Sequence, residues 1–331
     1  MTTYAAITGC GRSAPERVLT NFDLEKLVDT SDEWIRTRTG ISERRVVGDD
    51  EGTSDLAIRA ARAALAAAGI DPADLDLVIV ATCTPDWMFP SVAARVQHAL
   101  GARRAAAFDL NAACSGFIFA LATATQFIQN GSYRRVLVVG SEVLSRVVDW
   151  TDRKTCVLFG DGAGAVVLEA TDKPLGLLSY VLGTDGSGDR LLYLLGPAAS
   201  PEQRARAETT YLYMNGPEVF KFAVNVTVAA SRQVLERAGC TLEDIALFVP
   251  HQANERIIRA AARSLNLPAE KIYINLDRYG NTSAASIPIA LAEAAELGRL
   301  KPGDLVLMVG FGAGLTWAAG LVRWGSPNGV R

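Results

Sequence analysis

The sequence predicts an α/β fold that is built from two similar halves. Short runs rich in Val, Ile and Leu alternate with Ala-rich segments in which apolar residues recur at helical spacing. Alternating strands and helices of this kind are typical of sheets whose faces are covered. Several stretches of the chain also return at a constant offset, which indicates an internal duplication.

The alternating pattern defines the individual elements. The expected strands are Leu77–Ala81, Ala106–Leu110, Val136–Val139, Cys156–Phe159, Ala163–Leu168, Leu247–Val249, Ile272–Asn275 and Val306–Val309. The expected helices are Ser54–Ala68, Ser91–Leu100, Ser115–Gln129, Gly216–Ala238, Glu255–Leu265 and Ser286–Leu297.

The duplication has an offset of 170 residues. The segment ALAAAGIDPADLDLVIV around Gly69 resembles VLERAGCTLEDIALFVP around Gly239, and these two glycines lie 170 positions apart. The segment VLVVG, which ends at Gly140, matches VLMVG at the same offset, and GFIFAL matches SIPIAL. We therefore expect two halves, 1–170 and 171–331, that pack face to face with an active site between them.

The composition excludes several classes of protein. The 331 residues include only 2 histidines and 5 scattered cysteines without a C-x-x-C motif, so neither a metal site nor a disulfide framework is expected. The net charge of −3 argues against a nucleic-acid partner. The start of the chain does not resemble a signal peptide, and the uncharged stretch 110–133 contains polar amides typical of a buried helix rather than a membrane span. A cytoplasmic protein is expected.

Cys114 is the first candidate for chemistry. It lies in AAAFDLNAACSGFIFAL, where a strand is expected to end near Leu110 and a helix to begin near Ser115. Free amide N–H groups and the positive end of the helix dipole stabilise a thiolate at such a position. Cys114 is therefore a candidate nucleophile. A buried, unreactive thiol is the alternative that the local sequence leaves open.

The two histidines occupy different settings. His251 directly follows the expected strand Leu247–Val249 and precedes a helix, and functional groups gather at the carboxyl ends of strands in α/β folds. A purely structural histidine is the alternative. His98 lies near the end of a helix, where a positive charge complements the dipole, so we expect it to be structural.

Asn281 and two glycine-rich segments complete the candidates. Asn281 precedes the helix that is the internal counterpart of the Cys114 helix, although capping of that helix is the alternative role. FGDGAGA (Phe159–Ala165) and GFGAG (Gly310–Gly314) match neither of the common nucleotide-binding loops. Their glycines permit tight turns, and the turn at Gly312 can direct a backbone N–H towards an oxyanion.

Two groups of basic residues are notable. Thr30 and Glu33 have the spacing of a capping box, which predicts a short helix that carries Trp34, with Arg36 or Arg38 on the helix or at its exit.

The helix after His251 carries Arg256, Arg259 and Arg263 at i, i+3 and i+7, which places them on one face. This face is either simply solvated or a docking site for an acidic partner.

These features together resemble the thiolase superfamily and, within it, β-ketoacyl-acyl carrier protein synthase III, the initiating condensing enzymes of type II fatty acid synthesis. The motifs that carry the resemblance run in order through essentially the whole chain: TSDEWIRTRTGI, NAACSGF, FGDGAGA, VPHQAN, GNTSAAS and GFGAGLTW. The resemblance implies a doubled fold of five layers, αβαβα, which agrees with the duplication.

The resemblance implies a catalytic triad of Cys114, His251 and Asn281. Cys114 would attack the thioester of a short acyl-CoA, such as acetyl-CoA or a branched acyl-CoA, and release CoA. Malonyl-acyl carrier protein would then lose CO2 while His251 and Asn281 stabilise the enolate. The backbone N–H groups of Cys114 and Ala313 would bind the tetrahedral oxyanion. Ala313 departs from the family, which often has glycine there.

The resemblance also implies substrate contacts. The expected coenzyme A contacts are Trp34 and Arg153, which would flank the adenine, together with Arg38 and Asn254. The acidic carrier protein would dock on Lys221, Arg256, Arg259 and Arg263. Phe89 would reach across a homodimer interface into the acyl pocket of the partner, and the pocket itself would be lined by Leu144, Phe159, Leu191 and Met214. No cofactor is expected, because acyl-CoA is a substrate.

Four alternative functions can be compared on the same residues. A Cys-His-Asn enzyme that primes polyketide or other specialised pathways would share the triad. A non-catalytic scaffold would be expected to lack a triad residue, and a biosynthetic thiolase needs a second late cysteine, for which only Cys240 is available. Elongating condensing enzymes use Cys-His-His. Since His98 matches no motif, the histidine count favours initiation over elongation.

Overall fold

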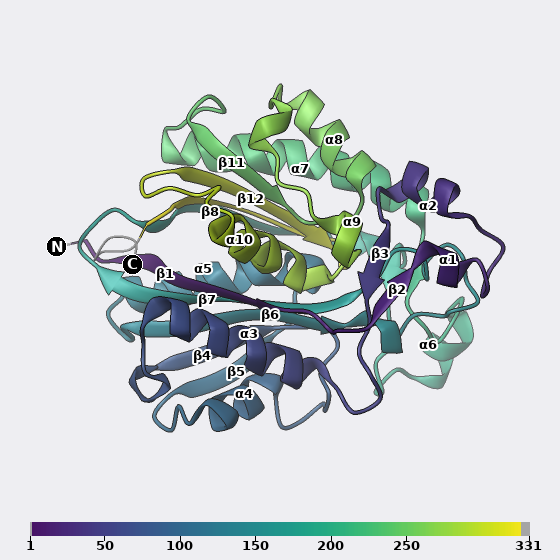
Figure 1. Ribbon diagram of the computed structural model, residues 1–331, viewed down its shortest axis with the longest axis horizontal. Helices are drawn as coiled ribbons and strands as arrows, with labels where there is room; N and C mark the ends of the chain where they lie inside the picture. Colours follow the sequence, from purple (N-terminus) through teal and green to yellow (C-terminus); the bar gives the residue numbers. More distant parts are fainter. Residues whose placement is uncertain (1, 326–331) are drawn as a thin grey trace.

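The computed structural model describes residues 2–325 and arranges them in five layers (Figure 1). One nine-stranded sheet has the order β11-β12-β13-β8-β1-β7-β6-β4-β5. Figure 1 shows α3 and α4 on one outer side, α7 and α8 on the other, and α5 and α10 between the two parts of the sheet. The expected αβαβα fold is confirmed.

The strands of the large sheet are β1 (Tyr4–Ser13), β4 (Leu77–Ala81), β5 (Ala106–Leu110), β6 (Arg135–Val143), β7 (Asp161–Thr171), β8 (Gly176–Thr184), β11 (Ile245–Pro250), β12 (Leu305–Gly312) and β13 (Thr316–Arg323). Two small sheets contain β2 (Val18–Thr20) with β3 (Glu43–Arg45), and β9 (Leu192–Tyr193) with β10 (Tyr213–Met214).

The longer helices are α2 (Asp32–Thr39), α3 (Thr53–Ala68), α4 (Val92–Leu100), α5 (Gly116–Gln129), α7 (Gly216–Ala238), α8 (Glu255–Ser264) and α10 (Ser286–Glu296). The shorter ones are α1 (Asn21–Leu24), α6 (Pro201–Arg206) and α9 (Leu276–Tyr279). Short 3-10 helices at Ala113–Ser115 and Ser283–Ala285 directly precede α5 and α10.

The two parts of the sheet repeat one pairing pattern. In the first, β4 pairs with β6 in parallel, and β6–β7 and β7–β1 are antiparallel. In the second, β11–β12 is parallel, and β12–β13 and β13–β8 are antiparallel. The parts meet where β1 and β8 pair at Ala5 and Gly176. Residue 170 lies near the end of β7, and the division into halves 1–170 and 171–331 stays a prediction.

The hydrophobic core follows the layers. One buried cluster surrounds the central helices and includes Phe117, Leu121 and Ile287. A second lies between α3, α4 and the first part of the sheet, and a third lies between α7, α8 and the second part. Because α5 and α10 contact strands of both parts, the segments before these helices are held inside the molecule.

Two expected strands are wrong. Residues 153–158 form turns, and the backbone there is fixed by buried Arg44, whose guanidinium donates to the Val157 carbonyl at 2.7 Å. Of Ile272–Asn275, only Ile272 forms a bridge, with Phe248. In both segments the apolar residues are buried or partly buried without a continuous partner strand, and sequence periodicity does not separate that case from a strand.

The sequence reasoning also missed β1, β8 and β13. In β1, glycines lower the strand propensity, yet the close packing of α3 requires them. A Cβ atom at Gly9 would lie 2.3 Å from the Ala64 carbonyl oxygen, and one at Gly11 would lie 2.3 Å from the Ala64 nitrogen.

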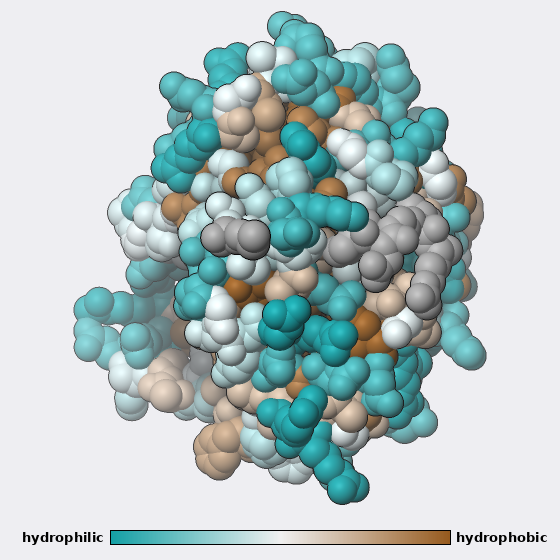
Figure 2. Space-filling view, turned by 90° about the vertical axis from the view of Figure 1, so that its left-hand side faces the viewer, coloured by the Kyte–Doolittle hydropathy of each residue, from teal (hydrophilic) through white to brown (hydrophobic). Residues whose placement is uncertain are grey.

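The face of the molecule drawn in Figure 2 is largely polar. Figure 2 shows one end of the molecule, where hydrophilic side chains dominate and hydrophobic ones form small separate patches. Among the helices of residues 2–325, none combines the length and the apolarity that crossing a membrane requires.

Candidate active site

Cys114 lies in the 3-10 helix Ala113–Ser115, directly before α5, as its position between a strand and a helix predicted. The side chain is buried, with 9% of the residue exposed. Burial raises the pKa of the Cys114 thiol to about 12, and a hydrogen bond from the Ser283 hydroxyl opposes this rise. The thiol therefore needs a proton acceptor before it can act as a nucleophile.

The glycine-rich turn after β12 packs against Cys114. A Cβ atom at Gly312 would lie 2.6 Å from the Cys114 backbone nitrogen, so only glycine permits this approach. The Thr316 hydroxyl lies 2.9 Å from the Ala313 carbonyl oxygen and 3.1 Å from that of Ala112. This hydroxyl links the glycine-rich turn to the turn that carries the thiol.

His251 follows β11 directly and is almost fully buried, with 1% exposed. Its Nδ1 lies 2.7 Å from Ser286 Oγ, and that oxygen also accepts the Gln252 N–H at 3.4 Å. When the Ser286 hydroxyl donates to Nδ1, the ring hydrogen lies on Nε2. Burial lowers the pKa of His251 to about 3, so the ring is a neutral donor at physiological pH. The Phe311 ring packs edge-on against it, with centroids 5.2 Å apart.

Asn281 lies between α9 and the 3-10 helix Ser283–Ala285, and 6% of it is exposed. Its backbone bridges to Phe159, with Asn281 N–H donating to the Leu158 carbonyl at 2.8 Å. Its Oδ1 accepts the Ser283 N–H at 2.9 Å. The oxygen is thereby fixed as an acceptor, and the Nδ2 group is directed elsewhere as a donor.

The duplication brings these residues together. The 3-10 helices before α5 and α10 contact one another, and β12 contacts the one that contains Cys114. β12 also pairs with β11, whose end leads to His251, and the His251 N–H donates to Val309 at 2.8 Å. Cys114, His251 and Asn281 therefore lie on contacting or paired segments between the two parts of the sheet.

A buried carboxyl at the end of β6 was missed by the sequence reasoning. Glu142 is 0% exposed and accepts hydrogen bonds from the hydroxyls of Thr84 and Ser283 and from the Cys83 N–H. Burial raises the pKa of this carboxyl, and these hydrogen bonds oppose the rise. A charged residue that follows the apolar run VLVVG was the available signal in the sequence.

The four residues expected to contact coenzyme A form two interacting pairs, Trp34 with Arg153 and Arg38 with Asn254. The Arg153 guanidinium stacks 4.9 Å from the Trp34 ring centroid and donates to the Asp29 carbonyl at 2.7 Å. An adenine between the two side chains would require Arg153 to move. Asn254 caps α8, because its Oδ1 accepts the Arg256 N–H at 2.8 Å. Its Nδ2 donates to the Arg38 carbonyl at 3.1 Å, and this hydrogen bond joins α2 to α8.

The helix that carries Trp34 begins one residue later than expected. Ser31, rather than Thr30, is the N-cap of α2, and its side chain accepts the Trp34 N–H. Arg36 and Arg38 both lie in the last turn of α2, and Arg36 pairs with Asp32 at 2.8 Å.

The expected acyl-pocket residues occupy two places. Leu144 and Phe159 are buried in one apolar cluster. Met214 pairs with Leu192 in the β9–β10 ladder, and the adjacent Leu191 carbonyl accepts the Asn215 N–H at 2.7 Å. Phe89 lies instead on a surface loop, where it is 85% exposed beside exposed Trp87 and Met88.

The expected carrier-protein residues are all exposed: Lys221, Arg256, Arg259 and Arg263. The Arg256 guanidinium lies 5.6 Å from the Phe220 ring centroid, which connects α8 to α7. Arg259 forms an ion pair with Glu255.

Comparisons with known proteins show the family of the chain. The family model for 3-oxoacyl-[acyl-carrier-protein (ACP)] synthase III matches residues 108–186, and the model of its C-terminal part matches residues 235–324. The β-ketoacyl-[acyl-carrier-protein] synthase III of Symbiobacterium thermophilum is 58% identical over 324 residues, which cover 96% of this chain and 98% of that protein. The chain belongs to the synthase III family.

Further relatives of the synthase III family support the assignment. The synthase III of a Roseiflexus species is 56% identical over 98% of this chain and 99% of its own length. The crystal structure of the Thermus thermophilus synthase III is 53% identical and superposes with a TM-score of 0.93, covering 97% of this chain and 99% of that one.

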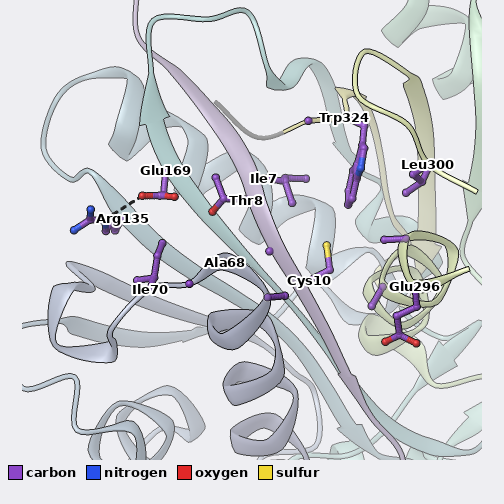
Figure 3. Close-up of a pocket in the computed structure, with 16 residues that line it drawn as sticks. Ile7, Thr8, Cys10, Ala68, Ile70, Arg135, Glu169, Glu296, Leu300 and Trp324 are labelled. Carbon is purple, nitrogen blue, oxygen red and sulfur yellow. Dashed lines mark hydrogen bonds and ion pairs between the residues drawn. The ribbon is translucent and has the colours of Figure 1, made fainter. Parts of the chain in front are cut away.

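A separate cavity lies away from the candidate triad. It has a volume of about 440 Å³ and is lined by β1 residues including Cys10, by the Arg135–Glu169 ion pair and by Trp324 (Figure 3). None of Cys114, His251 and Asn281 lines it. Within residues 2–325, no group of three or more His, Cys, Asp or Glu side chains has the arrangement of a metal site.

Proposed function

We propose that this chain is an initiating condensing enzyme of type II fatty acid biosynthesis. It joins a short acyl-CoA to malonyl-acyl carrier protein by decarboxylative Claisen condensation, and the products are 3-oxoacyl-acyl carrier protein, CoA and CO2. The observation that carries the proposal is that a member of the synthase III family holds Cys114, His251 and Asn281 on contacting or paired segments inside the molecule.

The first half-reaction acylates Cys114. The thiolate attacks the thioester carbonyl of acyl-CoA, the Cys114 sulfur bonds to the acyl carbon, and the bond to the CoA sulfur breaks. The tetrahedral oxyanion accepts hydrogen bonds from the backbone N–H groups of Cys114 and Ala313. The close approach of Gly312 to the Cys114 nitrogen supports this arrangement of donors.

The second half-reaction needs hydrogen-bond donors for an enolate. As CO2 leaves the malonyl group, negative charge develops on the thioester oxygen. His251 Nε2–H and Asn281 Nδ2–H are available as donors because Ser286 occupies His251 Nδ1 and Ser283 occupies Asn281 Oδ1. A neutral imidazole can fill this role, because its one N–H donates a hydrogen bond without the ring being protonated. The carbanion then attacks the acyl carbonyl on Cys114.

The substrates reach the site from the surface of α2, α7 and α8. Coenzyme A binds through Trp34, Arg38, Arg153 and Asn254. The acidic carrier protein docks on the exposed basic residues of α7 and α8, where Lys221 and Arg256 supply the charge and Arg259 and Arg263 extend it.

The enzyme acts as a cytoplasmic homodimer without a bound cofactor or metal. The exposure of Trp87, Met88 and Phe89 on one loop supports a dimer, because a group of large apolar side chains on a surface marks an interaction site. Phe89 then enters the acyl pocket of the partner subunit, which Leu144, Phe159, Leu191 and Met214 line.

Intact-mass spectrometry after incubation with acetyl-CoA, propionyl-CoA or isobutyryl-CoA tests the proposal. One acyl group per chain is expected, and Cys114→Ala should abolish the adduct. The absence of an adduct, or an adduct that survives this substitution, would contradict the proposal.

Product analysis then separates fatty acid initiation from the priming of a specialised pathway. We expect condensation with malonyl-acyl carrier protein from fatty acid synthesis. A product formed only with malonyl-CoA or with a polyketide carrier protein would favour the alternative.

A further inference from the structure

Glu142 occupies an unusual position for a charged residue. It lies near the end of β6, is fully buried and accepts hydrogen bonds from several groups around the nucleophile turn. Its counterpart at the 170-residue offset is Gly312, which packs against Cys114. The end of β12 thus contacts the turn of Cys114, whereas the end of β6 contacts the turn of Ser283.

The Cys83 N–H donates to both oxygens of the Glu142 carboxyl, at 3.1 Å to Oε2 and 3.2 Å to Oε1, and the two oxygens differ in their other neighbours. Oε2 also accepts the Thr84 hydroxyl at 2.6 Å. The Thr84 oxygen itself accepts the Val143 N–H at 2.9 Å, which directs its hydrogen towards Glu142. Oε2 is therefore held as an acceptor.

The environment of Oε1 permits exchange of a proton. Oε1 lies 3.1 Å from the Ser283 hydroxyl and 3.2 Å from the Cys83 thiol. The Ser283 hydroxyl also donates to Cys114 when the thiol is ionised. Since a hydroxyl has one hydrogen, it cannot donate to the carboxylate of Glu142 and to the Cys114 thiolate at once.

We propose that Ser283 and Glu142 form a proton relay that ionises Cys114. The Cys114 thiol gives its proton to Ser283 Oγ, and the Ser283 hydroxyl hydrogen passes to Glu142 Oε1. The Cys114 sulfur then bonds to the acyl carbon of acyl-CoA and the bond to the CoA sulfur breaks. The departing CoA thiolate takes the hydroxyl proton of Ser283, and Glu142 returns its proton to Ser283 Oγ. This inference rests on the proposed function, in which Cys114 is the nucleophile. Ser283 lies in the 3-10 helix that contacts the one containing Cys114, and Glu142 is a positioning residue that acts through Ser283.

The electrostatics of the site agree with this relay. A negative charge on Glu142 disfavours the Cys114 thiolate, and burial penalises each charge, so a single negative charge shared by the two groups is preferred. The titratable groups that face the carboxyl are the Cys83 and Cys114 thiols. His251 is a poor alternative base, because burial lowers its pKa to about 3.

Alkylation of Cys114 by iodoacetamide provides a test without acyl-CoA. The thiolate reacts, with loss of iodide, and peptide mass spectrometry follows the adduct at Cys114. Transfer of the proton from Cys114 to Glu142 leaves the total number of protons on the two groups unchanged, so it does not depend on pH. If the relay supplies most of the thiolate, the wild-type rate changes less than about threefold between pH 7 and pH 9. In Glu142→Gln, thiolate forms only by loss of a proton to solvent, and the rate should rise about 100-fold over the same range.

Two further variants keep the test decisive. Ser283→Ala interrupts the relay and should give the same steep profile as Glu142→Gln, so it decides the matter if Glu142→Gln does not fold. Glu293→Gln removes another buried glutamate, one that pairs with Arg278, and should keep the flat profile. A steep wild-type profile, or a flat profile in a folded Glu142→Gln or Ser283→Ala variant, would overturn the relay. A flat wild-type profile without acylation by acyl-CoA would overturn the proposed function instead.

Discussion

Ala113 and Ser283 lie 170 residues apart and share a left-handed backbone conformation, with φ values of 45° and 49°. Each is preceded by an asparagine whose Oδ1 accepts its N–H: Asn111 at 3.1 Å and Asn281 at 2.9 Å. The duplicated turn thus supplies the thiol in one half and the amide in the other. A non-glycine residue in this region costs free energy, which the surrounding packing must offset.

The approach of Gly312 to Cys114 predicts that Gly312→Ala impairs acylation. The added Cβ would lie 2.6 Å from the Cys114 nitrogen, so the turn must move. We expect the free energy of unfolding to fall by about 1–3 kcal/mol, and acylation of Cys114 to slow by more than about tenfold through the displaced oxyanion donor. Denaturant unfolding and a mass-spectrometric time course measure these effects. Ala313→Gly is the control, and equal acylation rates in both variants would contradict the prediction.

The buried neutral state of His251 predicts a pH-dependent stability. The pKa of this histidine falls from 6.5 to about 3 on folding, so the unfolded chain binds a proton between these values while the folded chain does not. The contribution of His251 to stability is complete above pH 6.5 and is lost as the pH falls towards 3. Between pH 7 and pH 5, the loss should be about 2 kcal/mol.

Urea unfolding of the wild type and of His251→Asn at both pH values isolates this contribution. The wild type should lose more unfolding free energy than the variant on acidification. Parallel losses in the two proteins would mean that His251 titrates normally in the folded state.

The hydrogen bond of Asn281 predicts a selective effect of Asn281→Asp. Aspartate keeps the oxygen that accepts the Ser283 N–H at 2.9 Å but lacks the Nδ2 donor. Acylation of Cys114 should persist, whereas decarboxylation of malonyl-acyl carrier protein should fall by about 100- to 1,000-fold, as expected for one lost oxyanion donor. Release of labelled CO2 and intact mass measure the two steps.

Asn111→Asp is the matched control for this substitution. Asn111 makes the corresponding hydrogen bond to Ala113 in the first half and is exposed. Its variant should decarboxylate at the wild-type rate. Equal defects in both variants would assign a structural role to Asn281.

The different settings of two arginines predict unequal roles in carrier-protein docking. Arg259 is paired with Glu255, whereas Arg256 forms no ion pair within residues 2–325 and lies against the Phe220 ring. Arg256→Glu should lower kcat/KM for malonyl-acyl carrier protein by about tenfold and Arg259→Glu by less than about threefold. Steady-state kinetics at two salt concentrations measures both effects. Equal effects would indicate that the Glu255 pair opens on docking.

The sequence by itself determined the local features: the turn that places Cys114 before α5, the end of β11 before His251, and the 170-residue repeat. These follow from periodicity and turn chemistry, which act over a few residues. Only the tertiary structure decided that the Glu142 carboxyl meets the Ser283 hydroxyl and that the Ser286 hydroxyl forms a hydrogen bond with the His251 ring. It also decided that residues 153–158 form turns rather than a strand. Such contacts join segments up to 141 residues apart. They depend on how the layers pack, because burial removes water and leaves each polar group to find its partner inside the molecule.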